Sequence, residues 1–76
     1  MEAKIILNTI EKTTEFVNEI QQYDADFDLL SGHSTIDGKS LVGVLSMDLS
    51  IPITLRVNVK NEEQEDDICY TLIKYL

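Results

Sequence analysis

The stretch Ile51-Pro52-Ile53-Thr54-Leu55-Arg56-Val57-Asn58-Val59 decides the fold class of this chain. Its odd-numbered positions are apolar while Thr54, Arg56 and Asn58 are polar, a period of two that is typical of a half-buried strand. Pro52 has no backbone N–H to donate to a ladder, so it belongs at the start of the strand. The segment from Ile51 to Val59 therefore predicts a sheet strand with one face in the core.

Helical segments are predicted on both sides of this strand. Downstream, Asn61-Glu62-Glu63-Gln64 has the spacing of a capping box and opens a helix that runs to the C-terminus. The apolar face of this helix consists of Ile68, Leu72, Tyr75 and Leu76. Upstream, Ser40 stands at the N-cap position of a two-turn helix, in which Val44 and Leu45 are expected to face the core.

The first half of the chain predicts a strand, a helix and a hairpin. Met1 to Leu7 is short and apolar at its end, as expected of a strand, and the capping-box spacing of Asn8 and Glu11 starts a helix. The face of that helix expected to be buried consists of Ile10, Thr13, Phe16, Val17 and Ile20. Phe27 to Leu30 and Ser34 to Ile36 are short strands around a turn at Gly32.

The resulting order, βαββαβα, predicts an α+β fold in which an antiparallel sheet is covered on one face by helices. With 76 residues, the chain 1–76 is expected to form a single domain. Fourteen acidic residues against six basic ones give a formal charge of −8, which disfavours nucleic acids and anionic membranes as partners. The lone Cys69 is expected to be a buried helical residue, and the simplest location is cytoplasmic.

The segment Lys39-Ser40-Leu41-Val42-Gly43-Val44-Leu45-Ser46-Met47 resembles the regulatory serine segment of HPr, the histidine-containing phosphocarrier protein of the bacterial sugar phosphotransferase system. Tyr23-Asp24-Ala25-Asp26 is similar to the helix-to-strand corner of that family, at matching distance from the serine segment. The resemblance extends over essentially the whole chain. It implies an HPr-like open-faced β-sandwich, a four-stranded antiparallel sheet covered on one face by three helices.

The phosphocarrier residues of that family are absent. The resemblance places Thr9 at the position of the phosphate-accepting histidine, Glu11 at that of the following arginine and Lys12 at that of the proline. A glutamate there repels an incoming phosphoryl group, which is the wrong sign for a transfer site. The chain is therefore expected to be a divergent member that carries no phosphohistidine.

Ser40 and its neighbours are the candidate functional residues. Besides capping the helix, Ser40 matches the serine that the family's HPr kinase/phosphorylase phosphorylates, after which the domain binds a transcriptional regulator, and Lys39 is placed to contact the phosphate. Leu41, Val42 and Leu45 correspond to the apolar patch through which the family docks its partners. Leu41 and Val42 are the better candidates for exposure.

No other motif indicates catalysis or metal binding. His33 lies at the predicted turn without a second ligand or a basic companion, and a solvated loop residue is the expected role. The acidic run from Glu62 to Asp67 lacks the alternating ligands and glycine of a calcium loop and suits a helix start. We therefore expect no enzyme activity, no metal and no cofactor.

The leading interpretation is a regulatory or protein-docking module without phosphocarrier activity, controlled by phosphorylation of Ser40. One alternative is a structural homo-oligomer or subunit of a larger assembly, formed through the same apolar patch or an edge strand. Another is a phosphocarrier that uses His33.

Overall fold

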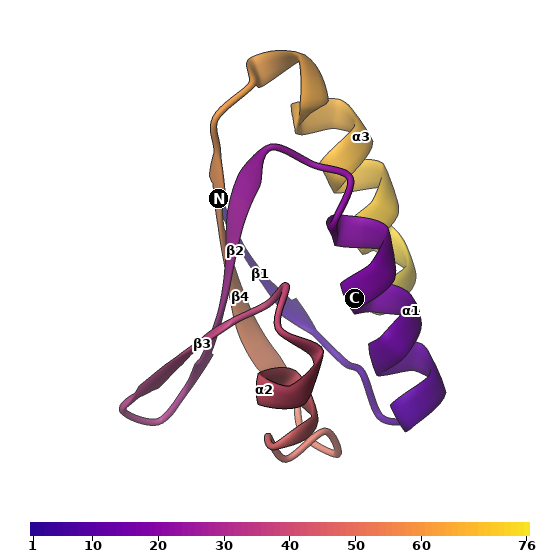
Figure 1. The fold of residues 1–76 in the computed structure, drawn as a ribbon, viewed down its shortest axis with the longest axis vertical. Helices are drawn as coiled ribbons and strands as arrows, with labels where there is room; N and C mark the ends of the chain where they lie inside the picture. The colour runs from indigo at the N-terminus through magenta and orange to yellow at the C-terminus, as the bar shows by residue number, and fades with distance from the viewer.

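The computed structural model describes residues 1–76 and shows an α+β fold. Its elements are β1 (Glu2–Ile5), α1 (Ile10–Ile20), β2 (Ala25–Ser31), β3 (Ser34–Asp37), α2 (Leu41–Leu45), β4 (Ile53–Val59), the 3-10 turn η1 (Glu62–Gln64), α3 (Glu65–Leu72) and the 3-10 turn η2 (Ile73–Tyr75). The predicted order βαββαβα is confirmed (Figure 1). None of the helices has the length and apolar composition needed to cross a membrane.

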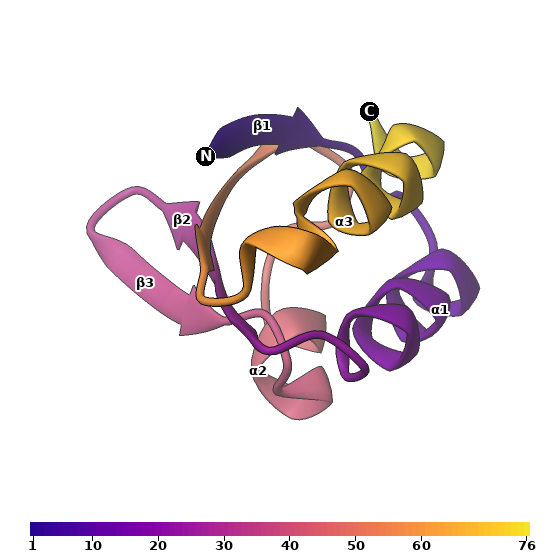
Figure 2. The same ribbon diagram turned by 90° about the horizontal axis from the view of Figure 1, so that it is seen from above.

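The four strands form one antiparallel sheet in the order β1-β4-β2-β3. The strand that decided the fold class, β4, lies inside the sheet, with Leu55 between Ala3 of β1 and Leu29 of β2. The three helices lie on one face of the sheet, and β1 and β3 form its two edges (Figure 2). The alternation in β4 is therefore explained, since its apolar side chains face the helices and its polar ones face solvent.

The core lies between the sheet and the helices. Its buried apolar side chains come from every layer: Ile5, Leu7, Phe16, Val17, Ile20, Tyr23, Ala25, Phe27, Leu29, Val44, Ile53, Leu55, Val57, Ile68, Leu72 and Tyr75. The ring of Tyr75 packs edge-on against Phe16, with centroids 5.2 Å apart, and so joins the C-terminal turn to α1. Burial of this set is the main favourable contribution to folding.

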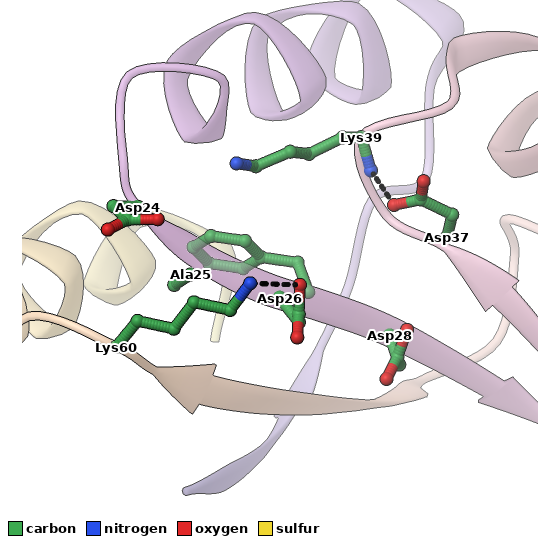
Figure 3. Close-up of a pocket in the computed structure, with 8 residues that line it drawn as sticks. Asp24, Ala25, Asp26, Asp28, Asp37, Lys39 and Lys60 are labelled. Atoms are coloured by element: carbon green, nitrogen blue, oxygen red, sulfur yellow. Dashed lines mark hydrogen bonds and ion pairs between the residues drawn. The ribbon is translucent and has the colours of Figure 1, made fainter.

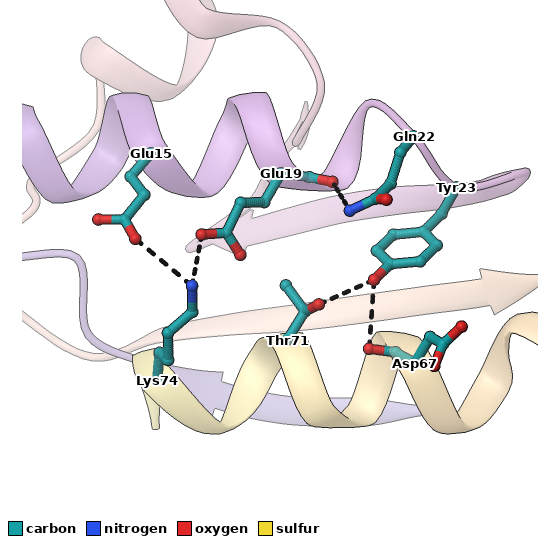
Figure 4. Close-up of polar contacts among 7 residues, drawn as sticks. All are labelled: Glu15, Glu19, Gln22, Tyr23, Asp67, Thr71 and Lys74. Atoms are coloured by element: carbon teal, nitrogen blue, oxygen red, sulfur yellow. Dashed lines mark hydrogen bonds and ion pairs between the residues drawn. The ribbon is translucent and has the colours of Figure 1, made fainter.

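Polar contacts also hold α1 and the turn that follows it against α3 and η2 (Figure 4). The hydroxyl of Tyr23 lies 2.8 Å from that of Thr71 and donates to the carbonyl of Asp67 at 3.3 Å. Lys74 pairs with the carboxylates of both Glu15 and Glu19. These contacts join residues more than forty positions apart, so they fix the end of α1 over the last helix.

The helix starts confirm two of the three predicted caps. Ser40 caps α2, and the Asn61 side chain accepts from the Glu63 N–H at 3.0 Å to start η1. The predicted capping box at Asn61 is not completed, because the Gln64 side chain accepts from the Asp24 N–H instead. At α1 the prediction was wrong by one residue, because Thr9 is the N-cap and accepts from Lys12 N–H at 3.0 Å. Asn8 instead has φ of 66°, a left-handed conformation that asparagine tolerates better than most residues.

The strands differ from prediction only in their ends. β1 is shorter than Met1 to Leu7, β2 and β3 are longer than expected, and Ile51 lies outside β4. Gly32 has φ of 59° at the β2–β3 turn, as expected of a residue without a Cβ.

Outside α2, three side chains expected in the core are exposed. Ile10 stands at the first position of α1 and is 67% exposed, and Leu76 lies beyond the last turn. Cys69 is exposed on α3, because Ile68 and Leu72 form the buried face and residue 69 is rotated about 100° from Ile68.

Candidate functional site

Ser40 lies at the start of α2 with its hydroxyl at the surface. The residue has extended backbone, with φ of −95° and ψ of 102°, and its Oγ accepts a 3.4 Å hydrogen bond from the Gly43 N–H. Its own N–H donates to the Asp37 carbonyl at 3.0 Å, which connects α2 to the end of β3. The hydroxyl is therefore accessible and only weakly engaged, since 3.4 Å is long for an N–H···O bond.

The apolar side chains of α2 divide between core and surface. Val42 is 83% exposed, as predicted, and Val44 is fully buried, also as predicted. Leu41 is half-buried and packs against the core, so its expected exposure is only partial. Leu45, which was expected in the core, is 37% exposed because it lies at the last position of a five-residue helix.

The first turn of α1 lies close to the loop that follows α2. The Asn8 N–H donates to the Leu49 carbonyl at 2.9 Å, which ties the two loops together. Thr9 and Glu11 are both exposed there, at the positions the resemblance assigns to the histidine and the arginine. The structure places a cap and a carboxylate at this corner, and no imidazole lies there to accept a phosphoryl group.

His33 is remote from the starts of α1 and α2. It lies in the turn between β2 and β3 and is exposed, as the sequence predicted. The β2–β3 hairpin extends away from the helical layer (Figure 1). His33 therefore lies apart from Thr9 and Ser40 and shares no site with them.

Lys39, which the sequence placed to contact a phosphate on Ser40, directs its side chain away from Ser40 in the unmodified chain. Its ammonium donates to the Tyr23 carbonyl at 2.7 Å and lies 5.8 Å from the centre of the Phe27 ring. The Lys39 carbonyl accepts from the Gln21 side chain at 2.7 Å. Both ends of this residue therefore hold the α1–β2 corner against the segment that leads into α2.

Lys39 also lines the one hollow of the surface, a polar depression of about 420 Å³ (Figure 3). The lining residues are Asp24, Ala25, Asp26, Phe27, Asp28, Asp37, Lys39 and Lys60. Asp28 and Asp37 are cross-strand neighbours, and Lys60 pairs with Asp26 at 3.4 Å. The sequence reading missed this hollow, although the spacing of Asp24, Asp26 and Asp28 puts them on one side of an extended segment.

The hollow offers carboxylates and two engaged lysines but no nucleophile. Four aspartates face two ammonium groups, and Lys39 and Lys60 are held by partners of their own. No group of three or more His, Cys, Asp or Glu side chains is arranged to hold a metal ion. The depression is an open, charged part of the surface.

Charge around α2 is negative. Asp48 follows the helix, and hydrogen bonds from the Ser50 hydroxyl and N–H hold the pKa of its carboxyl below its usual value. Glu11 and Asp37 lie at the neighbouring element ends, while Lys39 is turned inward. The segments that flank α2 in the chain therefore carry exposed carboxylates, at Asp37 and at Asp48.

Comparison of the chain with protein-family models, with curated proteins and with solved structures gives no match. None of these comparisons identifies a relationship to HPr.

Proposed function

We propose that this chain is an HPr-like domain that has no phosphohistidine chemistry and works as a regulatory protein-docking module. Its four-stranded antiparallel sheet with three helices on one face agrees with the architecture that the resemblance implies. Thr9 is engaged as a helix cap, and Glu11 adds negative charge where phosphoryl transfer needs positive charge. Both features favour a role other than phosphate transfer.

The observation that carries the proposal is the exposure of Val42 beside an accessible Ser40. A valine that is 83% exposed contributes little to the core and offers an apolar contact to a partner. Leu45 and the half-buried Leu41 extend this contact on the same short helix. Partner binding through an exposed apolar centre with a polar border is the common pattern of protein interfaces.

Ser40 provides the regulation in this proposal. Phosphorylation by an HPr kinase/phosphorylase adds about 1.5 to 2 negative charges two residues from Val42. The added charge changes which partner surfaces the apolar patch of Leu41, Val42 and Leu45 can bind, so a transcriptional regulator binds only the modified form. The hydroxyl is exposed, as a kinase substrate must be.

The kinase step has a matched control on the same helix. Ser46 is also exposed and lies at the C-cap of α2, where its hydroxyl donates to the Gly43 carbonyl. Incubation with an HPr kinase/phosphorylase and ATP is expected to add one acid-stable phosphate to the wild type and to Ser46→Ala, but none to Ser40→Ala. Labelling that is unchanged in Ser40→Ala, or absent from the wild type, would remove Ser40 from the proposal.

The docking step is tested with charge placed on two equally exposed side chains. Val42→Glu and Tyr70→Glu (79% exposed) should each change stability by no more than about 0.5 kcal/mol, whereas Val44→Glu buries a charge and should unfold the domain. Binding of the phosphorylated chain to the regulator, measured by calorimetry, should be lost in Val42→Glu and kept in Tyr70→Glu. Equal binding by both variants would contradict docking through α2.

The phosphocarrier alternative has its own assay. With phosphoenolpyruvate and the general phosphotransferase enzyme, we expect no acid-labile phosphate on the chain. Labelling that disappears in His33→Ala would instead establish the turn histidine as an acceptor.

A further inference from the structure

The edge strand β1 has a free side. Met1 and Val57 exchange both backbone hydrogen bonds, at 2.7 and 3.1 Å, so Met1, Ala3 and Ile5 direct their backbone groups toward β4. By the same alternation, the N–H and C=O groups of Glu2 and Lys4 point away from the sheet. β1 forms the outer edge of the sheet, with no strand beyond it (Figure 2).

We propose that this edge pairs with β1 of a second copy of the chain, antiparallel and centred on Ala3. In that register Glu2 of each copy stands opposite Lys4 of the other, and both residues present free backbone groups for the ladder. Opposite charges directly across a strand pair are favourable. Lys4 is exposed and makes no ion pair within its own chain, so it is available to the second copy.

The charges select this register over its neighbours. Centring the pair on Glu2 places two carboxylates opposite each other. Centring it on Lys4 places two ammonium groups opposite each other and needs the Ile6 N–H for the ladder, although that N–H already donates to the Tyr75 carbonyl at 2.6 Å. Glu2 keeps its 3.4 Å pair with Arg56 of its own chain, so it lies between two cations in the dimer. The charges of β1 are thus self-complementary only about Ala3.

Exposed apolar side chains flank the same edge on the helical face. The thiol of Cys69 lies 3.5 Å from the sulfur of Met1, which places the outer side of α3 beside the start of β1. Ile73 and Leu76 follow Cys69 along the chain and are 62% and 63% exposed. A two-fold axis through Ala3 brings these apolar groups of both copies toward each other above the joined strands.

The opposite edge lacks these features. β3 carries Ser34, Thr35, Ile36 and Asp37, with a carboxylate and no cation, so it has no opposite charge to offer a second copy. The formal charge of −8 on each copy opposes association at long range. Salt screens that repulsion, and dimerisation is therefore expected to strengthen between low salt and about 0.15 M.

A charge-exchange experiment on the full chain tests the register. Sedimentation equilibrium should show a monomer–dimer equilibrium in the wild type. Glu2→Lys and Lys4→Glu should each shift it to monomer by at least tenfold in Kd, and the double exchange should restore the dimer, because the opposed pairs are then complementary again. Melting curves confirm that each variant folds. A wild type that is monomeric up to about 1 mM, or a double exchange no better than the single variants, overturns the proposal.

Cross-linking gives a second, independent readout. At a non-hydrogen-bonded antiparallel pair, Cα atoms lie about 4.5 Å apart, within disulfide reach, so Ala3→Cys in a Cys69→Ala background should form a covalent dimer on mild oxidation. Glu2→Cys in the same background is the control, since residue 2 stands opposite Lys4 of the second copy and residue 2 of that copy lies two positions further along the strand. Equal cross-linking of both cysteines, or none of Ala3→Cys, contradicts pairing about Ala3. Monomeric behaviour here leaves the kinase and regulator assays of the α2 surface unaffected.

Discussion

Replacing Tyr75 with phenylalanine is expected to stabilise the protein, the reverse of the usual result for a buried tyrosine. The side chain is 1% exposed, and its hydroxyl has no hydrogen-bond partner. A buried hydroxyl without a partner carries its full desolvation penalty, about 1–3 kcal/mol, which phenylalanine does not have. The substitution keeps the ring, its edge-on contact with Phe16 and its neighbouring lysines. We therefore expect a gain of about 1 kcal/mol, which raises Tm by roughly 4–8 °C in a domain of this size.

Tyr23→Phe is the matched control for this change. Its hydroxyl is also buried, but it bonds to Thr71 and to the Asp67 carbonyl, so removal deletes two hydrogen bonds and leaves the Thr71 hydroxyl without this partner. A loss of about 1–2 kcal/mol is expected. Urea and thermal unfolding of both variants, at one pH and salt concentration, measure the two differences with opposite signs.

A destabilised Tyr75→Phe, comparable to Tyr23→Phe, would refute the reasoning and indicate that the hydroxyl is satisfied in solution, for example by Glu19. Alkaline titration adds a check. Burial, followed by the charges of Glu19 and Glu15, raises the pKa of Tyr75 to about 12. A raised pKa gives stability that is complete below the unfolded value near 10 and lost as pH rises toward 12, so the wild type should weaken there more than Tyr75→Phe.

Three further outcomes are expected. Gly38→Ala should lower the free energy of unfolding by about 1–3 kcal/mol, because the added Cβ would lie 2.9 Å from the Phe27 carbonyl oxygen, to which the Gly38 N–H is bonded. An unchanged Tm would show that this turn can move. The Lys74 hydrogen bond holds the pKa of Glu19 below its ordinary 4.5, so Lys74→Met should be less stable than the wild type above that pH. The difference should fade as pH falls through the lowered pKa, and a constant difference in acid-denaturation curves would contradict this. At low salt, acidification from neutral pH to about 5.5 should not lower Tm, since it reduces the net negative charge of −8 before most carboxylates protonate; a steady decline would count against self-repulsion.

The local elements of this fold could be predicted because their patterns are local. Alternation in β4 gave both the strand and its buried face, and the glycine at 32 marked the hairpin. The position of the α1 cap could not be settled in this way, because Asn8 and Thr9 are both good capping residues and only the backbone shows which of them directly precedes the helix. The pairing of β1 with β4 is also invisible to local patterns, since about fifty residues separate the two strands.

The candidate site was predicted in part, for a similar reason. Val42 and Ser40 lie where the sequence placed them, at the surface of α2. A five-residue helix is too short for periodicity to separate core from surface, so Leu45 was assigned to the wrong side. The inward direction of Lys39 depends on the carbonyl of Tyr23, a contact between segments that no spacing rule connects.

The sheet order β1-β4-β2-β3 has a consequence for the protein as it is synthesised. The β2–β3 hairpin is contiguous in the chain and can form as soon as it emerges, whereas β1 has no partner until β4 has been made. At about 5–20 residues per second, the roughly fifty intervening residues take roughly 3–10 s to add. For that time the first strand of a nascent chain is unpaired on both sides, exposed to chaperones and to other nascent chains on the same messenger RNA.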